Sequence, residues 1–170
     1  NAHFANKNAN AYSYKYKAIT LKEFARVVNY LTENNLFTVE DLERRLNAVQ
    51  AQVDKSKSNV KAYEARMKTL RDHLRYLKQY NETKPVLDEM SSIKWKGKRE
   101  KFQEGHDQEL RMFYVSQRML KGISITPKKW EQELAQLEQA HKNEYQVQAP
   151  LYEDLKMLWK VKVQVEQVRQ

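Results

Sequence analysis

Cysteine is absent from this sequence, and glycine and proline occur three times each in 170 residues. Without cysteine there are no disulfides, thiolate metal sites or cysteine nucleophiles, which fits a reducing, cytoplasmic setting. Because helix breakers are rare while Lys, Glu, Gln, Leu and Ala abound, we expect an all-α fold. No apolar run approaches the roughly 18 residues of a membrane span, and no signal peptide is visible, so we expect no membrane insertion.

Residues suited to catalysis or metal binding are not grouped in the sequence. The four histidines, His3, His73, His106 and His141, are scattered, so no two have the spacing of a metal site. The glycines lie far apart, which excludes a phosphate-binding loop. We therefore expect no cofactor, no metal, no catalytic residue and no enzyme activity from this chain by itself.

Basic residues outnumber acidic ones, with 31 Lys and Arg against 22 Asp and Glu. The net charge of +9 makes DNA a possible partner. A charged fraction of 31% also suits long helices, which expose much of their circumference to water. We expect an elongated domain rather than a compact sphere.

The sequence begins without a methionine, so we expect a fragment or a processed form. Residues 1–19 have no helical period and are expected to form a flexible lead-in. Their tyrosines Tyr12, Tyr14 and Tyr16 are interleaved with polar and basic residues, and could stack on single-stranded bases or dock on the first helix. The helical domain is expected to span residues 20–170.

The first helix is expected over residues 21–33. Thr20 and Glu23 fit a capping box at its start. Asn34 and Asn35 should end it, since asparagine tolerates the left-handed conformation of a C-terminal cap. The predicted apolar stripe consists of Leu21, Phe24, Ala25, Val28 and Leu31.

The longest regular pattern runs over residues 39–81. Thr38 and Asp41 give it a second capping-box start, so the first two helices should form a hairpin. Apolar residues then recur at alternating steps of four and three, the heptad pattern of a helix that requires a coiled-coil partner. Only Ser56 interrupts this repeat. The predicted inward positions are Leu42, Leu46, Val49, Val53, Ser56, Val60, Tyr63, Met67, Leu70, Leu74 and Leu77.

The same spacing recurs over residues 127–168, after the helix start formed by Thr126 and Pro127. The two long helices are nearly equal in length, so we predict that they form an antiparallel coiled coil, which requires no second chain. The inward positions of the second helix are Trp130, Leu134, Leu137, His141, Glu144, Gln148, Leu151, Leu155, Leu158, Lys162 and Val165.

The repeat of the second long helix is weak at its middle. Glu144 and Gln148 are polar, and Pro150 should kink the helix because it removes a backbone donor. We expect Ser56 of the first long helix to lie level with this point. A bend, or a third element that packs there, is predicted.

Two shorter helices are expected between the long ones. Pro85 should end the first long helix and open a short helix over 85–93. A further helix is predicted over 98–121, weakened at Gly105 by about 1 kcal/mol relative to alanine and stopped at Gly122. Together they would form a small helical insertion at the end of the coiled coil away from the N-terminal helix.

The most basic window of the chain lies in this insertion. Five basic residues and one acid occur in the nine residues 94–102, together with two aromatic residues. Such a segment could contact a nucleic-acid backbone while an aromatic ring stacks on a base. Alternatively, Trp95 and Phe102 are core anchors and the lysines are ordinary surface. The nucleic-acid-binding candidates are Lys94, Trp95, Lys96, Lys98, Arg99 and Lys101.

Three short segments carry a family resemblance. They are Leu21-Lys22-Glu23-Phe24-Ala25-Arg26, Asn29-Tyr30-Leu31-Thr32-Glu33-Asn34-Asn35-Leu36 and Val39-Glu40-Asp41-Leu42. Together they resemble the region that follows the catalytic domain in relaxases, the mobilisation nucleases of plasmids and conjugative elements. The resemblance continues loosely over residues 63–75 and 101–120, and departs at Asn35, where that family usually has glycine.

The resemblance implies that the parent protein nicks one DNA strand with a tyrosine and a histidine cluster in an amino-terminal domain. No position here matches that catalytic motif. The chain would then be a non-catalytic C-terminal module that supports DNA processing in conjugation by contacting DNA or proteins of the conjugative transfer complex. The heptads indicate an alternative, a coiled-coil protein-interaction or spacer domain with no nucleic-acid binding.

Overall fold

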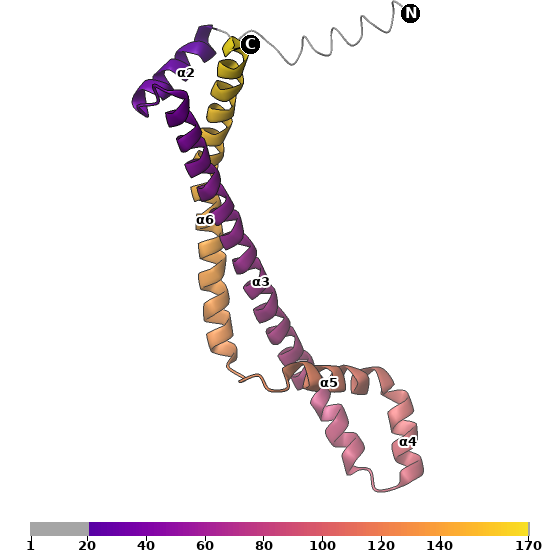
Figure 1. Ribbon diagram of the computed structural model, residues 1–170. Coiled ribbons are helices and arrows are strands. Elements are labelled where there is room, and N and C mark those ends of the chain that lie inside the picture. The colour runs from indigo at the N-terminus through magenta and orange to yellow at the C-terminus, as the bar shows by residue number, and fades with distance from the viewer. Residues whose placement is uncertain (1–20, 170) are drawn as a thin grey trace, which may run out of the picture. The chain divides into compact units, whose positions relative to one another are not determined.

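The computed structural model describes residues 21–169. Within this range every regular element is a helix, which confirms the all-α fold for the described residues (Figure 1). The lead-in expected over residues 1–19, and Thr20 of the first capping box, lie outside them. The helices are α2 (Leu21–Glu33), α3 (Val39–Ser92), α4 (Lys96–Gly105), α5 (Asp107–Leu120) and α6 (Pro127–Arg169).

The helices belong to two compact units. Unit 1 consists of the described residues up to Val53 and those from Ala149 onwards, so it holds α2, the start of α3 and the end of α6. Unit 2 is Asp54–Gln148, with the rest of α3, α4, α5 and the start of α6. None of the helices in residues 21–169 has an apolar stretch that would reach across a bilayer.

Unit 1 is built on a core that α3 and α6 share. Its buried members are Leu42, Leu46, Val49, Val53, Leu158 and Val161. From α2, Val27, Tyr30 and Leu31 pack against this core. Full burial of one such aliphatic side chain contributes about 1.5–3 kcal/mol, so the core holds the three helices of this unit together.

The turn between α2 and α3 follows the sequence prediction. Asn35 has φ 55°, the left-handed conformation expected of a C-terminal cap. The Leu36 amide donates to the Leu31 carbonyl at 2.8 Å, which satisfies one of the last carbonyls of α2. At the start of α3 the Asp41 amide donates to the Thr38 hydroxyl at 3.1 Å, and the Thr38 amide donates to the Asp41 carboxylate at 3.2 Å. This reciprocal pair is a capping box.

The packing face of α2 differs from the predicted stripe. Leu31 is the one member of that stripe that packs on the core. The other residues of α2 that pack on it are Val27 and Tyr30. Leu21 and Phe24 are exposed. Successive helix residues are rotated by about 100°, so the apolar residues of α2 cover a wide arc. Because α3 and α6 cover only one side of that arc, the other side is open.

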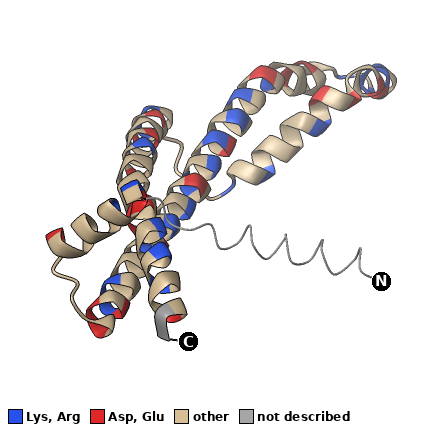
Figure 2. Cartoon of the chain, turned by 90° about the horizontal axis from the view of Figure 1, so that it is seen from above, with Lys and Arg blue, Asp and Glu red and all other residues tan. Residues whose placement is uncertain are grey.

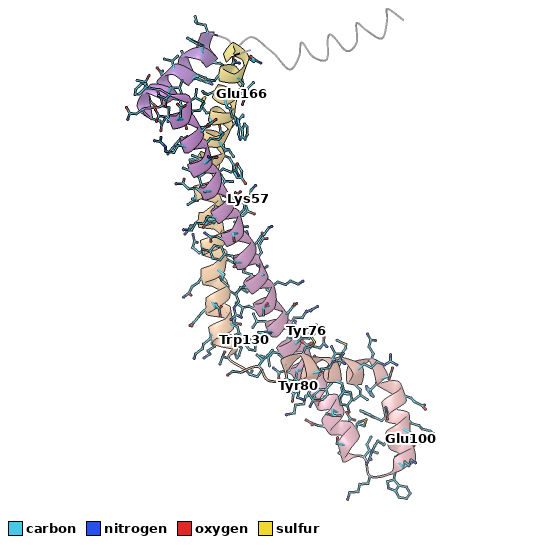
Figure 3. All side chains as sticks on the ribbon, in the orientation of Figure 1. Lys57, Tyr76, Tyr80, Glu100, Trp130 and Glu166 are labelled. Carbon is cyan, nitrogen blue, oxygen red and sulfur yellow. The ribbon has the colours of Figure 1, made fainter. Side chains whose placement is uncertain are left out.

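Unit 2 has its own buried residues, contributed by three helices. They are Val60, Met67 and Leu70 from α3, Leu110, Phe113 and Leu120 from α5, and Trp130 from α6. The rings of Tyr80 and Phe113 lie 5.0 Å apart, which packs α5 on α3, and the rings of His73 and Trp130 lie 5.2 Å apart, which packs α6 on α3. Figure 3 labels Tyr80 and Trp130. Aromatic pairs at this separation add to the stability that burial provides.

The first long helix does not stop at Pro85. Residues 39–81 and 85–93, predicted as two helices, form the single helix α3 with Pro85 inside it. Pro85 and Asn81 are both exposed, so the Asn81 carbonyl that loses its amide donor remains open to water. The prediction was wrong because an exposed proline costs one hydrogen bond without exposing any core.

The helix predicted over 98–121 is instead two helices. α4 begins two residues earlier and ends at Gly105, and α5 begins at Asp107. His106 separates them with φ −122° and ψ 23°, outside the helical region. Its Nδ1 lies 2.7 Å from a Glu109 carboxylate oxygen in the first turn of α5. Glycine at 105 lowers the cost of breaking the helix there, and Gly122, with φ 78°, follows the end of α5 as predicted.

Candidate interaction surfaces

No group of three His, Cys, Asp or Glu side chains that could hold a metal ion occurs among residues 21–169. The histidines of this range instead make separate contacts with single neighbours. His141 lies 3.1 Å from Glu64. His73 packs on the Trp130 ring, and its buried Nδ1 has no hydrogen bond to any residue that the structure describes. These contacts join α3 to α6.

The pairing of α3 and α6 in unit 2 includes a polar contact at the interruption of each repeat. The Ser56 hydroxyl donates to the Glu144 carboxylate at 2.6 Å, and the Asn59 amide approaches the same oxygen at 3.5 Å. Ser56 is 3% exposed. The expected level of Ser56 is therefore confirmed, and the buried serine provides a hydrogen-bond donor to the acid that faces it.

The two helices run antiparallel within unit 2. Ser56 contacts Glu144, and further along α3 His73 contacts Trp130, so rising numbers in one helix meet falling numbers in the other. Each predicted inward position of α3 and α6 is buried or half-buried in its own unit. The burial of these positions agrees with the predicted spacing, while Val161, which lies outside the predicted set, is also buried in the core of unit 1.

An arginine of α3 forms a forked ion pair with α6 at the edge of this interface. Arg66 donates to the two oxygens of Glu133 at 2.6 and 2.9 Å. This hydrogen bonding holds the pKa of the Glu133 carboxyl below its usual range. The two side chains are 47% and 39% exposed, so solvent weakens their attraction and the pair orients the helices more than it stabilises them.

A polar cluster lies where α2, α3 and α6 meet in unit 1. Arg45 of α3 donates to Asp154 of α6 at 3.0 Å. The Tyr30 hydroxyl of α2 is buried and has no hydrogen-bond partner among residues 21–169. Burial raises the pKa of the Tyr30 phenol, while the neighbouring Arg45 guanidinium acts in the opposite direction. Tyr30 thus adds buried area where α2, α3 and α6 meet. The ion pair of Arg45 and Asp154 favours the contact of α3 with α6 there.

The six predicted nucleic-acid-binding residues lie together at the connection from α3 to α4 and on α4 itself, and all are exposed. Trp95 is 76% exposed, so the alternative that it anchors a core is wrong for this residue. Phe102 is half-buried, with its ring 4.2 Å from that of His106. Figure 2 shows basic and acidic positions interspersed along the helices.

Two of the basic residues at this connection have contacts within the chain. Arg99 donates through Nε and Nη2 to the Ile93 carbonyl at 3.1 and 2.6 Å, which closes the connection. Lys96 lies 3.9 Å from Glu100, a position labelled in Figure 3. No ion pair to a described residue engages Lys94 or Lys98, so these two amines are available to an anion.

Large apolar side chains are exposed on two surfaces of unit 1, neither of which the sequence analysis predicted to be an interaction surface. On α2 they are Leu21, Phe24 and Val28, and on α6 they are Tyr152, Trp159 and Val163. Contiguous exposed apolar residues are typical of protein-contact sites. The helical spacing was visible in the sequence, but spacing alone does not say which side of a helix is covered.

Comparison with known families gives a match over part of the chain. The family model of Swi5 matches residues 37–90, which are the end of the turn before α3 and nearly all of that helix. Swi5 is a family of helical proteins of DNA recombination and repair. The matched segment covers less than half of the chain. The similarity to Swi5 is therefore stated for this helix alone. No curated protein and no solved structure matches the chain.

This match corrects the expected relationship to relaxases. The matching family is one of recombination and repair, and nothing supports a relaxase, a role in conjugation or partners in a conjugative transfer complex. The segments that carried the resemblance form α2, its C-terminal cap and the first turn of α3. Capping residues and leucines at these positions satisfy the general requirements of a helical hairpin, so they do not distinguish one helical family from another.

Proposed function

We propose that this chain is a non-catalytic protein-interaction domain, with an antiparallel coiled coil of α3 and α6 as its scaffold. The observation that carries the proposal is that each long helix covers the apolar repeat of the other, down to the contact between Ser56 and Glu144. A scaffold that is complete within one chain leaves other helix faces available for partners. The likeness to Swi5 over α3 supports a role within an assembly for DNA recombination or repair.

The open side of α2 is the surface that we assign to a protein partner. Leu21 is 86%, Phe24 57% and Val28 42% exposed, and their spacing places them on one side of the helix. The adjoining side of the helix packs on the core of unit 1 through Val27 and Tyr30. Because α2 is already held in place, it would lose little conformational entropy when its open apolar stripe packs on an apolar stripe of a second protein.

Site-specific photocrosslinking in cells tests this function. A photoreactive phenylalanine analogue at position 24 should capture a protein of DNA recombination or repair. The matched control carries the analogue at Tyr114, an exposed aromatic position of unit 2, and should not capture it. Adducts at position 24 that contain no recombination or repair protein would contradict the proposed process, and identical adducts at both positions would contradict the proposed surface.

The exposure of Trp95 favours a second function, contact with nucleic acid. Its ring is available for stacking, and Lys94 and Lys98 beside it are free for phosphate contacts. We propose that this connection binds single-stranded DNA within the same assembly. Fluorescence anisotropy with a labelled oligonucleotide should show binding at about 50 mM salt that weakens steeply by about 200 mM.

Two substitutions separate stacking from general charge in that experiment. Trp95→Ala should weaken binding by about 1–3 kcal/mol, while Lys55→Gln, an exposed lysine on α3 of unit 2, should change it little. Absence of binding at about 50 mM salt would exclude this second function, because phosphate contacts are strongest there. It would leave the protein-interaction function unaffected.

A further inference from the structure

A second stripe runs along α6 in unit 1, beside the stripe that packs on α3. Tyr152, Lys156, Trp159 and Val163 follow one another at steps of four, three and four, so they share one side of the helix. Tyr152 is 40%, Trp159 47% and Val163 45% exposed. The adjacent positions Leu155 and Leu158 belong to the covered side. The stripe therefore repeats the spacing of a coiled-coil seam while its large residues stay open to solvent.

We propose that two copies of the chain associate through this stripe, with their α6 helices antiparallel. A crossing midway between Lys156 and Trp159 sets Lys156 against Trp159 of the partner subunit, and Tyr152 against Val163 of the partner subunit. A lysine amine over an indole is attractive, and aromatic on aliphatic contact buries both side chains. Every member of the stripe then meets a complementary residue from the same set, as a two-fold interface requires.

Charge at the edge of the stripe agrees with the same arrangement. Glu153 and Lys160 lie seven residues apart, next to Tyr152 and Trp159 respectively, and neither forms an ion pair with a described residue. Antiparallel association brings Glu153 to within about 3 Å along the helix axis of Lys160 of the partner subunit, so opposite charges meet on that flank. A parallel pair in register would instead set lysine against lysine at positions 156 and 160, which is repulsive.

This association differs from the proposed protein-interaction function, because it uses α6 and leaves the open side of α2 free. It also differs from the pairing of α3 with α6, which one chain completes by itself. The Trp159 ring is held in place from one side, since the Lys162 amine lies 5.0 Å from its centroid. A ring that is already oriented loses little freedom when a second surface covers it.

Sedimentation of the full chain from low to high micromolar concentration tests the proposal. We expect a dimer, and we expect Trp159→Lys to be a monomer because each introduced amine would face Lys156 of the partner subunit. Trp95→Lys, at an exposed tryptophan of unit 2, should remain dimeric. Circular dichroism should show that both variants keep their helices. A wild-type chain that is monomeric throughout, or a Trp159→Lys variant that still dimerises, would overturn the proposal.

Cysteine mapping tests the orientation, because the chain has no cysteine of its own. Lys156→Cys lies near the two-fold axis, where the two thiols are separated by only about 5 Å along the helices, and should form a disulfide-linked dimer on oxidation. The two thiols of Glu166→Cys should lie about 25 Å apart and remain unlinked. Linkage at 166 as well as at 156 would show a parallel pair in register, and linkage at 166 in either case would overturn the antiparallel interface.

Discussion

Ser56 of α3 donates a hydrogen bond to Glu144 of α6 at 2.6 Å, so the polar interruption of one repeat meets a polar interruption of the other. If either helix were shifted by one heptad, Ser56 and Glu144 would each face an apolar residue. An unpaired buried polar group costs about 1–3 kcal/mol, and slippage would leave two. The pair therefore favours one register of the helices.

Removing one member of the Ser56–Glu144 pair should destabilise the chain more than removing both. Ser56→Ala leaves the half-buried Glu144 carboxylate with only the longer Asn59 contact, and we expect a loss of about 1–3 kcal/mol in the free energy of unfolding. Ser56→Ala with Glu144→Leu should recover most of that loss, since no buried acid remains. Urea unfolding of the four proteins in a double-mutant cycle measures the coupling. Additive effects would show that the contact does not stabilise the chain.

Pro85→Ala should stabilise the chain. Pro85 is exposed and inside α3, so alanine can restore the amide donor to the Asn81 carbonyl without disturbing the core. Proline is about 3 kcal/mol less favourable than alanine within a helix, and its rigidity in the unfolded chain offsets up to about 1 kcal/mol of this. We expect a gain of about 2 kcal/mol in urea unfolding. A loss of stability would contradict a continuous helix at this position.

Leu158→Ala should destabilise unit 1. Leu158 is 0% exposed and lies in the core shared by α3 and α6. Large-to-small changes at such positions cost about 2–5 kcal/mol, because the removed methyl groups leave a cavity. Val147→Ala, at a position 52% exposed on the same helix, should change the free energy of unfolding by less than about 0.5 kcal/mol. Equal effects of the two substitutions would contradict the assigned packing face of α6.

The ion pair between Arg66 and Glu133 should make a small, pH-dependent contribution. The hydrogen bond from Arg66 lowers the pKa of Glu133 in the folded chain, so its stabilisation is present above the ordinary glutamate pKa of about 4.3. It should disappear as pH falls further, through the lowered pKa of the folded state. Unfolding of wild type and Arg66→Gln at several pH values should show a difference near neutrality that vanishes in acid. Lys55→Gln, which removes no carboxylate contact, should show no such convergence.

The spacing of apolar side chains predicted the pairing of the long helices, because the polarity of each residue can be read directly from the sequence. An apolar residue at each third or fourth position must be covered, and α3 and α6 are long enough to cover each other. The capping residues Thr38, Asp41 and Asn35 were also predictable, since their conformations follow from local hydrogen bonding. These features needed no knowledge of distant contacts.

The remaining features depend on which side of a helix is covered. Pro85 was read as a stop because the sequence does not show that it faces solvent, where water can replace the lost donor. The choice of Val27 and Tyr30 over Phe24 as packing residues depends on where α3 and α6 lie against α2. The exposure of Trp95 likewise depends on the closure of its turn by Arg99, which no spacing rule predicts.

The central claim is that α6 covers α3 in one antiparallel register. Cysteines at Ser56 and Glu144, treated with a short bifunctional thiol reagent at high dilution, test it most directly in a chain that has no other cysteine. A mismatched pair at Ser56 and Glu133 is displaced by about 16 Å along α6 and serves as the control. The antiparallel register predicts rapid linkage within one chain for the first pair and little for the second. Equal linkage of both pairs, or linkage of the mismatched pair alone, would contradict it.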